Sequence, residues 1–500
     1  MKRNNIKFTS LAIAVAATTL VAGCNSSNSN NDEVTKAPKN VILMITDGAS
    51  DGAWDIASYW QNGTLANDSV PYREIETRYA MTTFPLNTSL TPSDYCDDES
   101  GRPQITYDQT QVWDDTPSAD PDSRRPFEGY EYLNKGYTDS AAAGTALSTG
   151  EKTYNNAIAV DFCGRDLKII TEYAKEQGMS TGVVTSVQFN HATPASFGAH
   201  HVSRNSYDEL ASYMFKEGLL DLIMGTGHPA FDGQGVERGT GNYSHRYISE
   251  QDWNDLKSGE LFANGHDLPW GMFDTKQDFE LLANNAASVE LMKAPLLGLV
   301  QNESTLQQGR QCQEGQDYDV AFDCTYLDNS PSLEVMSKGA LNYLSQNENG
   351  FFVMIEGGAV DWAAHANHTA RIIEEQVDFD DSVAAVMQWV EENSSWEETM
   401  LVITTDHGNS YVLGEQSDQV AFAAIDNPGA DTMPEVKYFS GDHTNELVRV
   451  YVKGVGEAMF DQHIVGTDTE YANHYQNVGA TGEYFDNTNI FDVMKEYIEK

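Results

Sequence analysis

The sequence has few positive charges, with 30 Lys and Arg residues against 76 Asp and Glu residues among 500 and a formal net charge of −46. A surface of that sign repels phosphate backbones, so the composition excludes nucleic acid as a binding partner. Binding of a small anion then requires locally concentrated positive charge, and metal ions are the obvious source. Such acidity also suits high salt, where surface repulsion is screened, so we expect a salt-tolerant protein, with an ordinary acidic exoenzyme as the alternative.

Long apolar runs are also lacking, and the run Leu11–Ala22 is too short to span a membrane. It follows a basic start, as in a secretion signal, and the small residues before Cys24 resemble the lipobox of bacterial lipoproteins. We therefore expect a signal peptide over 1–23, a flexible tether over 24–36 and a lipid on Cys24. This predicts an exported, lipid-anchored protein of the periplasm or cell surface, with an outer-membrane lipoprotein favoured and a soluble secreted protein as the alternative.

Cysteine is scarce, and four residues remain after Cys24. An even number in an exported chain indicates two disulfides, for which three pairings exist. The short-loop choice joins Cys312 to Cys324 and leaves Cys96 with Cys163. No cysteine lies at metal-ligand spacing.

Three apolar runs share one feature, an acidic residue directly after the run. Continuous Val and Ile runs bounded by Gly are typical of strands buried on both faces, as in a parallel sheet. The carboxyl ends of such strands line the ligand-binding crevice, where clustered carboxylates are costly unless cations bind. The runs are Val41–Thr46 before Asp47, Phe351–Ile355 before Glu356, and Leu401–Thr405 before Asp406 and His407.

Helical patterns alternate with these strands and with a further strand at Gly182–Val187, which indicates βαβ units. We expect an α/β fold, with a doubly wound, mostly parallel central sheet and helices on both faces. One catalytic domain would fill 37–500, with surface insertions near 86–134 and 225–332. The expected helices are Leu167–Gln177, Phe279–Met292, Leu333–Leu344 and Val377–Glu392.

Two short patterns point to metal binding. Asp361 and His365 are four residues apart, which places both on one face of a helix, and His368 lies on the same face. Asp406 and His407 form a second pair. A solvated polar face is the alternative for the helix, but the coincidence of both pairs with the strand-end acids favours a metal site.

Ser140 begins a stretch of very small residues, Ala141–Ala146. A helix starting there offers free N–H groups and a favourable dipole to a phosphate, and small side chains let a substrate approach the backbone. A merely capped helix is the alternative, since Ser and Asp are good N-caps.

Six segments together resemble the alkaline phosphatase family, in the family's order and across most of the mature chain. They are TDSAAAGTALSTGEKTYNNAIAVD (138–161), HATPA (191–195), HVSRNSY (201–207), EGGAVDWAAH (356–365), TTDHG (404–408) and GDHT (441–444).

The resemblance implies three metal ions, two Zn²⁺ and one Mg²⁺. In this set His443 takes the place of His368. The implied ligands are Asp361, His365 and His443 for the first zinc, Asp406 and His407 for the second, Asp47 between the second and third metals, and Thr193 and Glu356 for the third.

The resemblance also implies hydrolysis of phosphate monoesters for phosphate scavenging. Ser140 would attack phosphorus to form a phosphoserine, Arg204 would hold the phosphate, and Asp139 would orient Arg204. A phosphodiesterase or sulfatase with the same metal core and a non-catalytic lipoprotein that binds metal or phosphate are the alternatives. Homodimers are usual in the family, so the chain is a candidate for one.

Two positions depart from a well-studied bacterial subgroup of the family, which has Asp and Lys where this chain has His191 and Trp362. Other members, including marine ones, are similar to this chain there. An imidazole near the third metal favours transition metals over Mg²⁺, which leaves the identity of that metal open.

Overall fold

The computed structural model describes residues 39–66, 70–94, 96, 106–120, 124–284 and 295–500. The expected signal peptide, tether and lipid site lie outside these residues. The chain from Ala37 to Lys500 forms one compact unit. Across the described ranges, no helix combines the length and the apolar character needed to cross a membrane.

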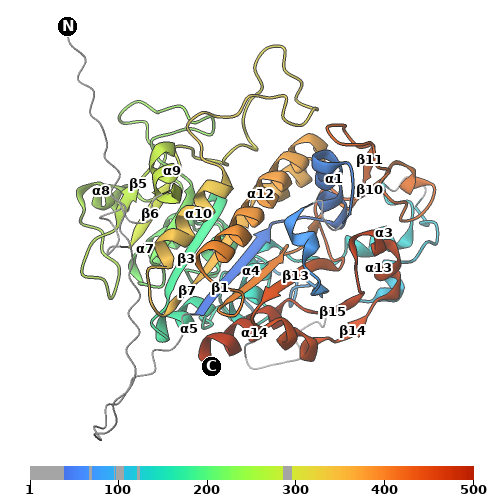
Figure 1. Ribbon diagram of the computed structural model, residues 1–500, viewed down its shortest axis with the longest axis horizontal. Coiled ribbons are helices and arrows are strands. Elements are labelled where there is room, and N and C mark those ends of the chain that lie inside the picture. The colour runs from blue at the N-terminus through green and yellow to red at the C-terminus, as the bar shows by residue number, and fades with distance from the viewer. Residues whose placement is uncertain (1–38, 67–69, 95, 97–105, 121–123, 285–294) are drawn as a thin grey trace, which may run out of the picture. The chain divides into compact units, whose positions relative to one another are not determined.

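Eleven strands of the described chain form one central sheet (Figure 1). Its order is β14-β15-β2-β13-β8-β1-β7-β3-β4-β6-β5. The strands are β1 (Lys39–Thr46), β2 (Arg78–Thr82), β3 (Ser180–Gln188), β4 (Leu222–Thr226), β5 (Gly271–Phe273), β6 (Leu296–Leu299), β7 (Gly350–Gly357), β8 (Thr399–Thr404), β13 (Val448–Gly454), β14 (Gly466–Thr467) and β15 (Glu483–Asp486).

Two small two-stranded sheets pair β9 (Gly408–Asn409) with β12 (His443–Thr444) and β10 (Val412–Gly414) with β11 (Val436–Tyr438). The helices are α1 (Asp51–Asn62), α2 (Gln109–Val112), α3 (Glu128–Leu133), α4 (Ser140–Thr149), α5 (Ile170–Glu176), α6 (Ala192–Ala195), α7 (Tyr207–Lys216), α8 (Glu250–Ser258), α9 (Lys276–Asn284), α10 (Leu333–Leu344), α11 (Ala359–His365), α12 (Thr369–Asn393), α13 (Thr469–His474) and α14 (Thr488–Glu499).

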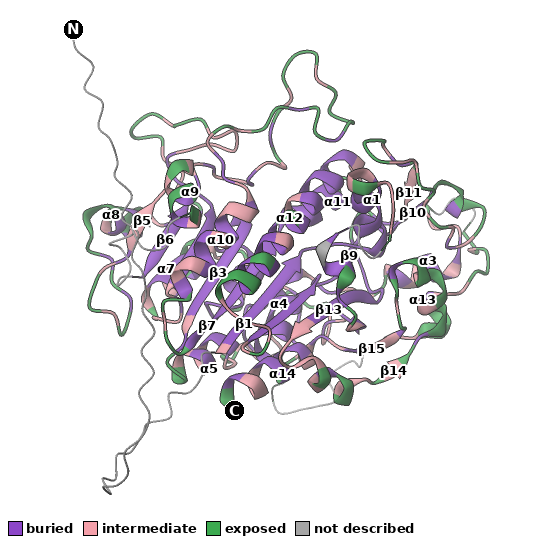
Figure 2. Cartoon of the chain, viewed as in Figure 1, coloured by how far each residue is buried: buried purple, intermediate pink, exposed green. Residues whose placement is uncertain are grey.

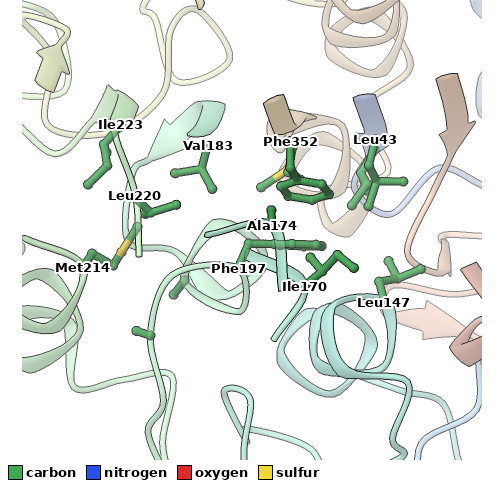
Figure 3. Packing of buried hydrophobic residues seen from close by; sticks show 14 of the residues in the cluster. Leu43, Leu147, Ile170, Ala174, Val183, Phe197, Met214, Leu220, Ile223 and Phe352 are labelled. Carbon is green, nitrogen blue, oxygen red and sulfur yellow. The ribbon is translucent and has the colours of Figure 1, made fainter. Parts of the chain in front are cut away.

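Helices cover both faces of the sheet because its inner strands are apolar on both sides. Along β1, Leu43 faces a core shared with α4, α5 and α14, whereas Ile42 and Met44 face a core shared with α1, α10 and α12. Figure 3 shows part of the first core, where Leu43 and Phe352 of the sheet lie near Ile170 of α5. The inner strands are accordingly buried along nearly their whole length (Figure 2). The predicted doubly wound α/β class is confirmed.

Parallel pairing holds from β8 to β5, whereas β13 runs antiparallel to β8 and β2. The expected strands at 41–46, 182–187, 351–355 and 401–405 all appear, with ends shifted by a few residues. The region 225–332 differs from a plain surface insertion, because it supplies β5 and β6 to the sheet edge. The helix expected over Phe279–Met292 starts earlier, at Lys276, and is described to Asn284.

Both expected disulfides are present, Cys96–Cys163 and Cys312–Cys324, with Cα atoms 5.6 and 4.8 Å apart. The loop closed by Cys312–Cys324 is held to α12 by buried charges. Arg310 donates to Glu374 at 2.8 Å and to the carbonyl of Cys324. These bonds attach the loop to the helix that follows the α11 metal-ligand segment.

Candidate metal centre

The three strand-end acids lie at the same edge of the sheet, as the sequence predicts. Strand β1 lies between β7 and β8, and its Ile45 aligns with Glu356 on one side and Thr404 on the other. Asp47 directly follows β1, Asp406 lies two residues after the end of β8, and both are buried. The parallel register therefore gathers three carboxylates in a small volume.

The first group of potential ligands contains Asp361, His365 and His443. Helix α11 supplies the first two, four residues apart, and β12 supplies His443. The Nε2 atoms of the two histidines are 3.1 Å apart, and the Nε2 atom of His443 is 3.3 Å from Asp361 Oδ1. The ring Nδ1 atoms face backbone carbonyls of Gly441 and Thr138, which turns both Nε2 atoms toward one point.

The second group contains Asp47, Asp406 and His407. His407 Nε2 is 3.2 Å from Asp406 Oδ2 and 3.6 Å from Asp47 Oδ1. The hydroxyl of Ser140 lies 3.2 Å from the same Nε2 atom and 3.4 Å from Asp47. The expected nucleophile is thus in contact with the expected second metal site, and the rings of His407 and His443 stack at 3.7 Å, which joins the two groups.

The residues expected around the third metal also lie together. Thr193 at α6 donates to Asp47 Oδ2 at 3.4 Å, and Glu356 accepts a short hydrogen bond from Thr185 of β3. All four side chains are buried. Asp47 therefore stands between the second group and this third one.

Asp139 connects the start of α4 with Arg204. Its Oδ1 accepts from the N–H of Ala142 and caps the helix, while its Oδ2 accepts from Arg204 Nη1 at 3.1 Å and from the N–H of Asn156 at 2.9 Å. One carboxylate thus fixes both the helix that begins with Ser140 and the guanidinium expected to hold phosphate.

Two glycines allow this close packing. Gly48 follows Asp47 with φ of +69°, and a Cβ there would meet Asp361 Oδ1 at 2.5 Å. At Gly144 of α4, a Cβ would meet Ser196 Oγ at 2.9 Å. Small residues in α4 therefore let it approach the segment that carries Thr193.

The strand-end carboxylates strain the site electrostatically. Burial, reinforced by neighbouring carboxylates, raises the pKa of Asp47 well above its usual range. Burial and the charge of Asp361 raise the pKa of Asp406 to about 7, and burial raises the pKa of Glu356 to about 7. Burial lowers the pKa of His407 well below its usual value, so this ring is neutral, as a metal ligand must be.

The buried acceptors and the ligand types of the site are suited to binding divalent cations. Asp406 Oδ2 and Glu356 Oε1 are fully buried and accept no hydrogen bond from the described residues. Buried acceptors without donors are costly, and a cation would satisfy them. The mixture of imidazole and carboxylate suits zinc in the first two groups, and the oxygen ligands of the third suit magnesium.

The remaining candidates take different positions. His191 lies beside the site, with Nε2 3.3 Å from Arg204 Nη2 and its ring 5.7 Å from that of Trp362. His368 instead caps α12 and packs against Tyr318 at 4.0 Å, outside both groups. The alternative that spacing alone offered for His368 is therefore wrong, because the chain turns between α11 and α12.

Sequence reasoning missed two supporting residues. Thr185 donates to Glu356, and Asn409 donates to Asp361 Oδ1 at 2.7 Å. Thr185 lies within a predicted strand, so a search for polar residues near strand ends would have found it. Asn409 follows the motif that contains Asp406 and His407, but its partner on α11 is distant in sequence.

The fold and the site together define a class of α/β proteins. In this class, carboxylates and histidines suited to metal binding lie beside a serine at the start of a helix. The sequence model described as alkaline phosphatase matches residues 127–482 of this chain. The chain therefore belongs to the alkaline phosphatase family.

Comparison with individual proteins gives the same family. Alkaline phosphatase 4 of Bacillus subtilis is 34% identical over 275 residues, covering 54% of this chain and 49% of that protein. Alkaline phosphatase 3 of the same organism is 30% identical over 365 residues, covering 69% and 68%. Among solved structures, the alkaline phosphatase of the Antarctic bacterium TAB5 has a TM-score of 0.56 at 21% identity, covering 93% of this chain and 99% of that one. A variant of that enzyme has Mg bound in a site called M3.

Proposed function

We propose that this protein hydrolyses phosphate monoesters through a phosphoserine intermediate and releases orthophosphate. The observation that carries the proposal is the position of Ser140 Oγ, 3.2 Å from His407 and 3.4 Å from Asp47 at the start of α4. A serine in contact with two potential metal ligands is suited to act as a nucleophile rather than only as a helix residue.

In this proposal Ser140 Oγ attacks phosphorus as the bond to the alcohol breaks, and water later cleaves the phosphoserine. Arg204 binds two phosphate oxygens with its planar fork, and Asp139 holds that fork in place. The N–H groups at the start of α4 add a favourable dipole for the dianion. The guanidinium and the helix start both offset the repulsion that an acidic protein exerts on its substrate.

Zinc would be held by the first two ligand groups and magnesium by Asp47, Thr193 and Glu356. His191 lies two residues before Thr193, and an imidazole at that position would favour a transition metal in the third site instead. When bound, such ions supply positive charge for the attacking and leaving oxygens and lower the pKa of hydroxyl groups and water. Metal ligands bind in their unprotonated form, and a bound cation would favour the ionised form of Asp47, Asp406 and Glu356, whose pKa values burial raises.

The rival reaction class is tested with nitrophenyl substrates. We expect the zinc- and magnesium-loaded protein to hydrolyse nitrophenyl phosphate at least about a hundredfold faster than bis-nitrophenyl phosphate, since a diester has one non-bridging oxygen and one negative charge fewer for the cations and Arg204 to bind, and carries a second bulky ester group. Comparable or reversed rates, or preferential hydrolysis of nitrophenyl sulfate, would assign the chain to a different reaction of the same fold.

Arg204→Lys separately tests whether the guanidinium of Arg204 binds phosphate. We expect kcat/KM for a monoester to fall about 10- to 100-fold, because an ammonium keeps the charge but loses the two parallel hydrogen bonds. Arg165→Lys is the matched control, since Arg165 is exposed and pairs with Asp161. If both variants keep wild-type kcat/KM, Arg204 is not a substrate ligand.

Export and attachment form a second part of the proposal. The basic start, the apolar run and Cys24 support a lipoprotein that scavenges phosphate outside the cytoplasm. Intact-mass measurement of protein from membranes of a native-type host would reveal a lipid on Cys24 as the first residue. A mature chain beginning elsewhere would contradict this attachment.

A further inference from the structure

A cavity adjoins the proposed catalytic site. Its volume is about 320 Å³, and two of its lining residues, His191 and Trp362, border the site already described. The rest of the lining comes from other parts of the chain. These further residues are Gln188, Tyr207, Arg246, Tyr247, Glu303 and Ser304.

Arg246 is the unusual member of this lining. It is exposed and makes no hydrogen bond or ion pair with the described residues, in a chain where acids outnumber bases by more than two to one. Its guanidinium lies over the rings of Tyr207 and Tyr247, at 5.4 and 5.2 Å from their centroids. The two rings pack edge to face at 5.0 Å, so the aromatic pair holds the cation in place.

The one carboxylate in the lining does not neutralise Arg246. Glu303 forms a short ion pair with Arg238. Its backbone carbonyl accepts from Gln188 Nε2 at 3.2 Å, which fixes that amide, while Gln188 Oε1 is buried without a hydrogen-bond partner. The cavity thus offers an unpaired cation and an unpartnered buried acceptor.

The cavity connects the cation to the catalytic site through His191. Arg246 and His191 line the same cavity. Arg204 itself contacts His191 at 3.3 Å. The cavity that contains Arg246 therefore reaches the residue that contacts Arg204.

A second hollow beside the site has the reverse character. It is lined by His443 and by Asp139, Tyr137 and Asp442, and the Tyr137 hydroxyl donates to Asp442 at 2.8 Å. Carboxylates there disfavour an anionic group. The two hollows beside the site therefore differ in charge, with an arginine lining one and two carboxylates lining the other.

We propose that the cavity around Arg246 is a subsite for a second anionic group on the leaving alcohol of the substrate. This inference rests on the proposed function and narrows it, since it predicts a preference for monoesters that carry another phosphate or carboxylate. The phosphate to be cleaved lies at Ser140 and Arg204, and the distal anion pairs with Arg246. Hydroxyl groups along the leaving alcohol can donate to Gln188 Oε1.

The test compares bisphosphates of linear diols, three to six carbons long, with the monophosphates of the same diols at constant ionic strength. The two substrates have nearly the same leaving alcohol. The ratio of their kcat/KM values, bisphosphate over monophosphate and counted per cleavable phosphate, therefore measures the effect of the distal phosphate. We expect the bisphosphate of the best-fitting length to be favoured about tenfold, the effect of one charged hydrogen bond near solvent. Arg246→Gln should reduce this ratio to near one, and Arg246→Lys should retain part of it.

Arg165→Gln removes the same charge from an exposed position and should leave the ratio at its wild-type value. The subsite is refuted if no chain length is preferred, or if both glutamine variants reduce the ratio equally, which would indicate only a long-range field. Hydrolysis of phenyl phosphate, which has no second anionic group, distinguishes failure of the subsite from failure of the proposed phosphatase activity. If the metal-loaded wild type cleaves it without a bisphosphate preference, only the subsite fails, whereas no cleavage refutes the proposed function and the subsite with it.

Discussion

Ser140→Ala should lower the rate of orthophosphate release from nitrophenyl phosphate by about a thousandfold or more. The substitution removes the oxygen that would form the bond to phosphorus, and the remaining groups only bind and polarise the substrate. Metal content should stay at the wild-type value, because Ser140 is not among the carboxylates and histidines of the two ligand groups. Rate and metal content are measured on the same preparation.

Ser148→Ala is the matched control for this variant. Ser148 lies in the same helix, is buried, and donates to the carbonyl of Thr145 at 3.3 Å, away from the ligand groups. Acid quenching during turnover should trap a phosphoryl group on a peptide containing Ser140 in the wild type and in Ser148→Ala. If Ser140→Ala retains more than a tenth of the wild-type rate, the phosphoserine route is wrong.

Asp406→Asn should separate metal binding from the stability of the folded chain. Burial and the charge of Asp361 raise the pKa of Asp406 to about 7, compared with about 4 in an unfolded chain. Between these values the metal-free folded state holds more protons than the unfolded state, so its stability falls as pH rises, and the full penalty applies above pH 7. An amide carries no such charge, so metal-free Asp406→Asn should melt at a higher temperature than metal-free wild type at pH 8.

With metals supplied, the wild type should instead melt at a higher temperature than Asp406→Asn. A cation binds the ionised carboxylate of the wild type and stabilises it, whereas the variant lacks one ligand of the second group and should lose about a thousandfold in activity. Melting curves at pH 5 and pH 8, with and without chelator, provide the measurement. Asp418→Asn is the control, since that carboxylate is exposed and pairs with Lys437. A lower melting temperature for metal-free Asp406→Asn at pH 8 would show that the buried charge is not the source of strain.

Much of the site could be predicted because parallel strands bring distant residues to one edge. Asp47, Glu356 and Asp406 each follow an apolar run, and the run itself predicts a strand buried on both faces. The helical spacing of Asp361 and His365 adds a second group. These signals are local, and the parallel register then places them in contact.

Other features depend on contacts that no local pattern contains. Spacing alone points to His368, and the family resemblance replaces it by His443. The turn after α11 and the return of β12 give the physical reason for that exchange. Strand β6 is only four residues long, so its short apolar run within 225–332 carries little signal, although it pairs with β4 and β5 in the sheet. Arg246 could not be predicted as part of the site, because it becomes a neighbour of His191 only when the chain before α8 packs beside α7.

The central claim is that the two ligand groups hold metal ions that Ser140 needs for phosphoryl transfer. Elemental analysis of the purified protein, paired with its phosphatase rate during stepwise chelation and restoration of zinc and magnesium, tests this claim most directly. We predict at least two bound ions per chain, one for each group, with the rate falling as they are removed and returning as they are restored. A folded, metal-free protein that keeps its full rate, or a metal-replete protein that releases no orthophosphate from simple monoesters, would contradict it.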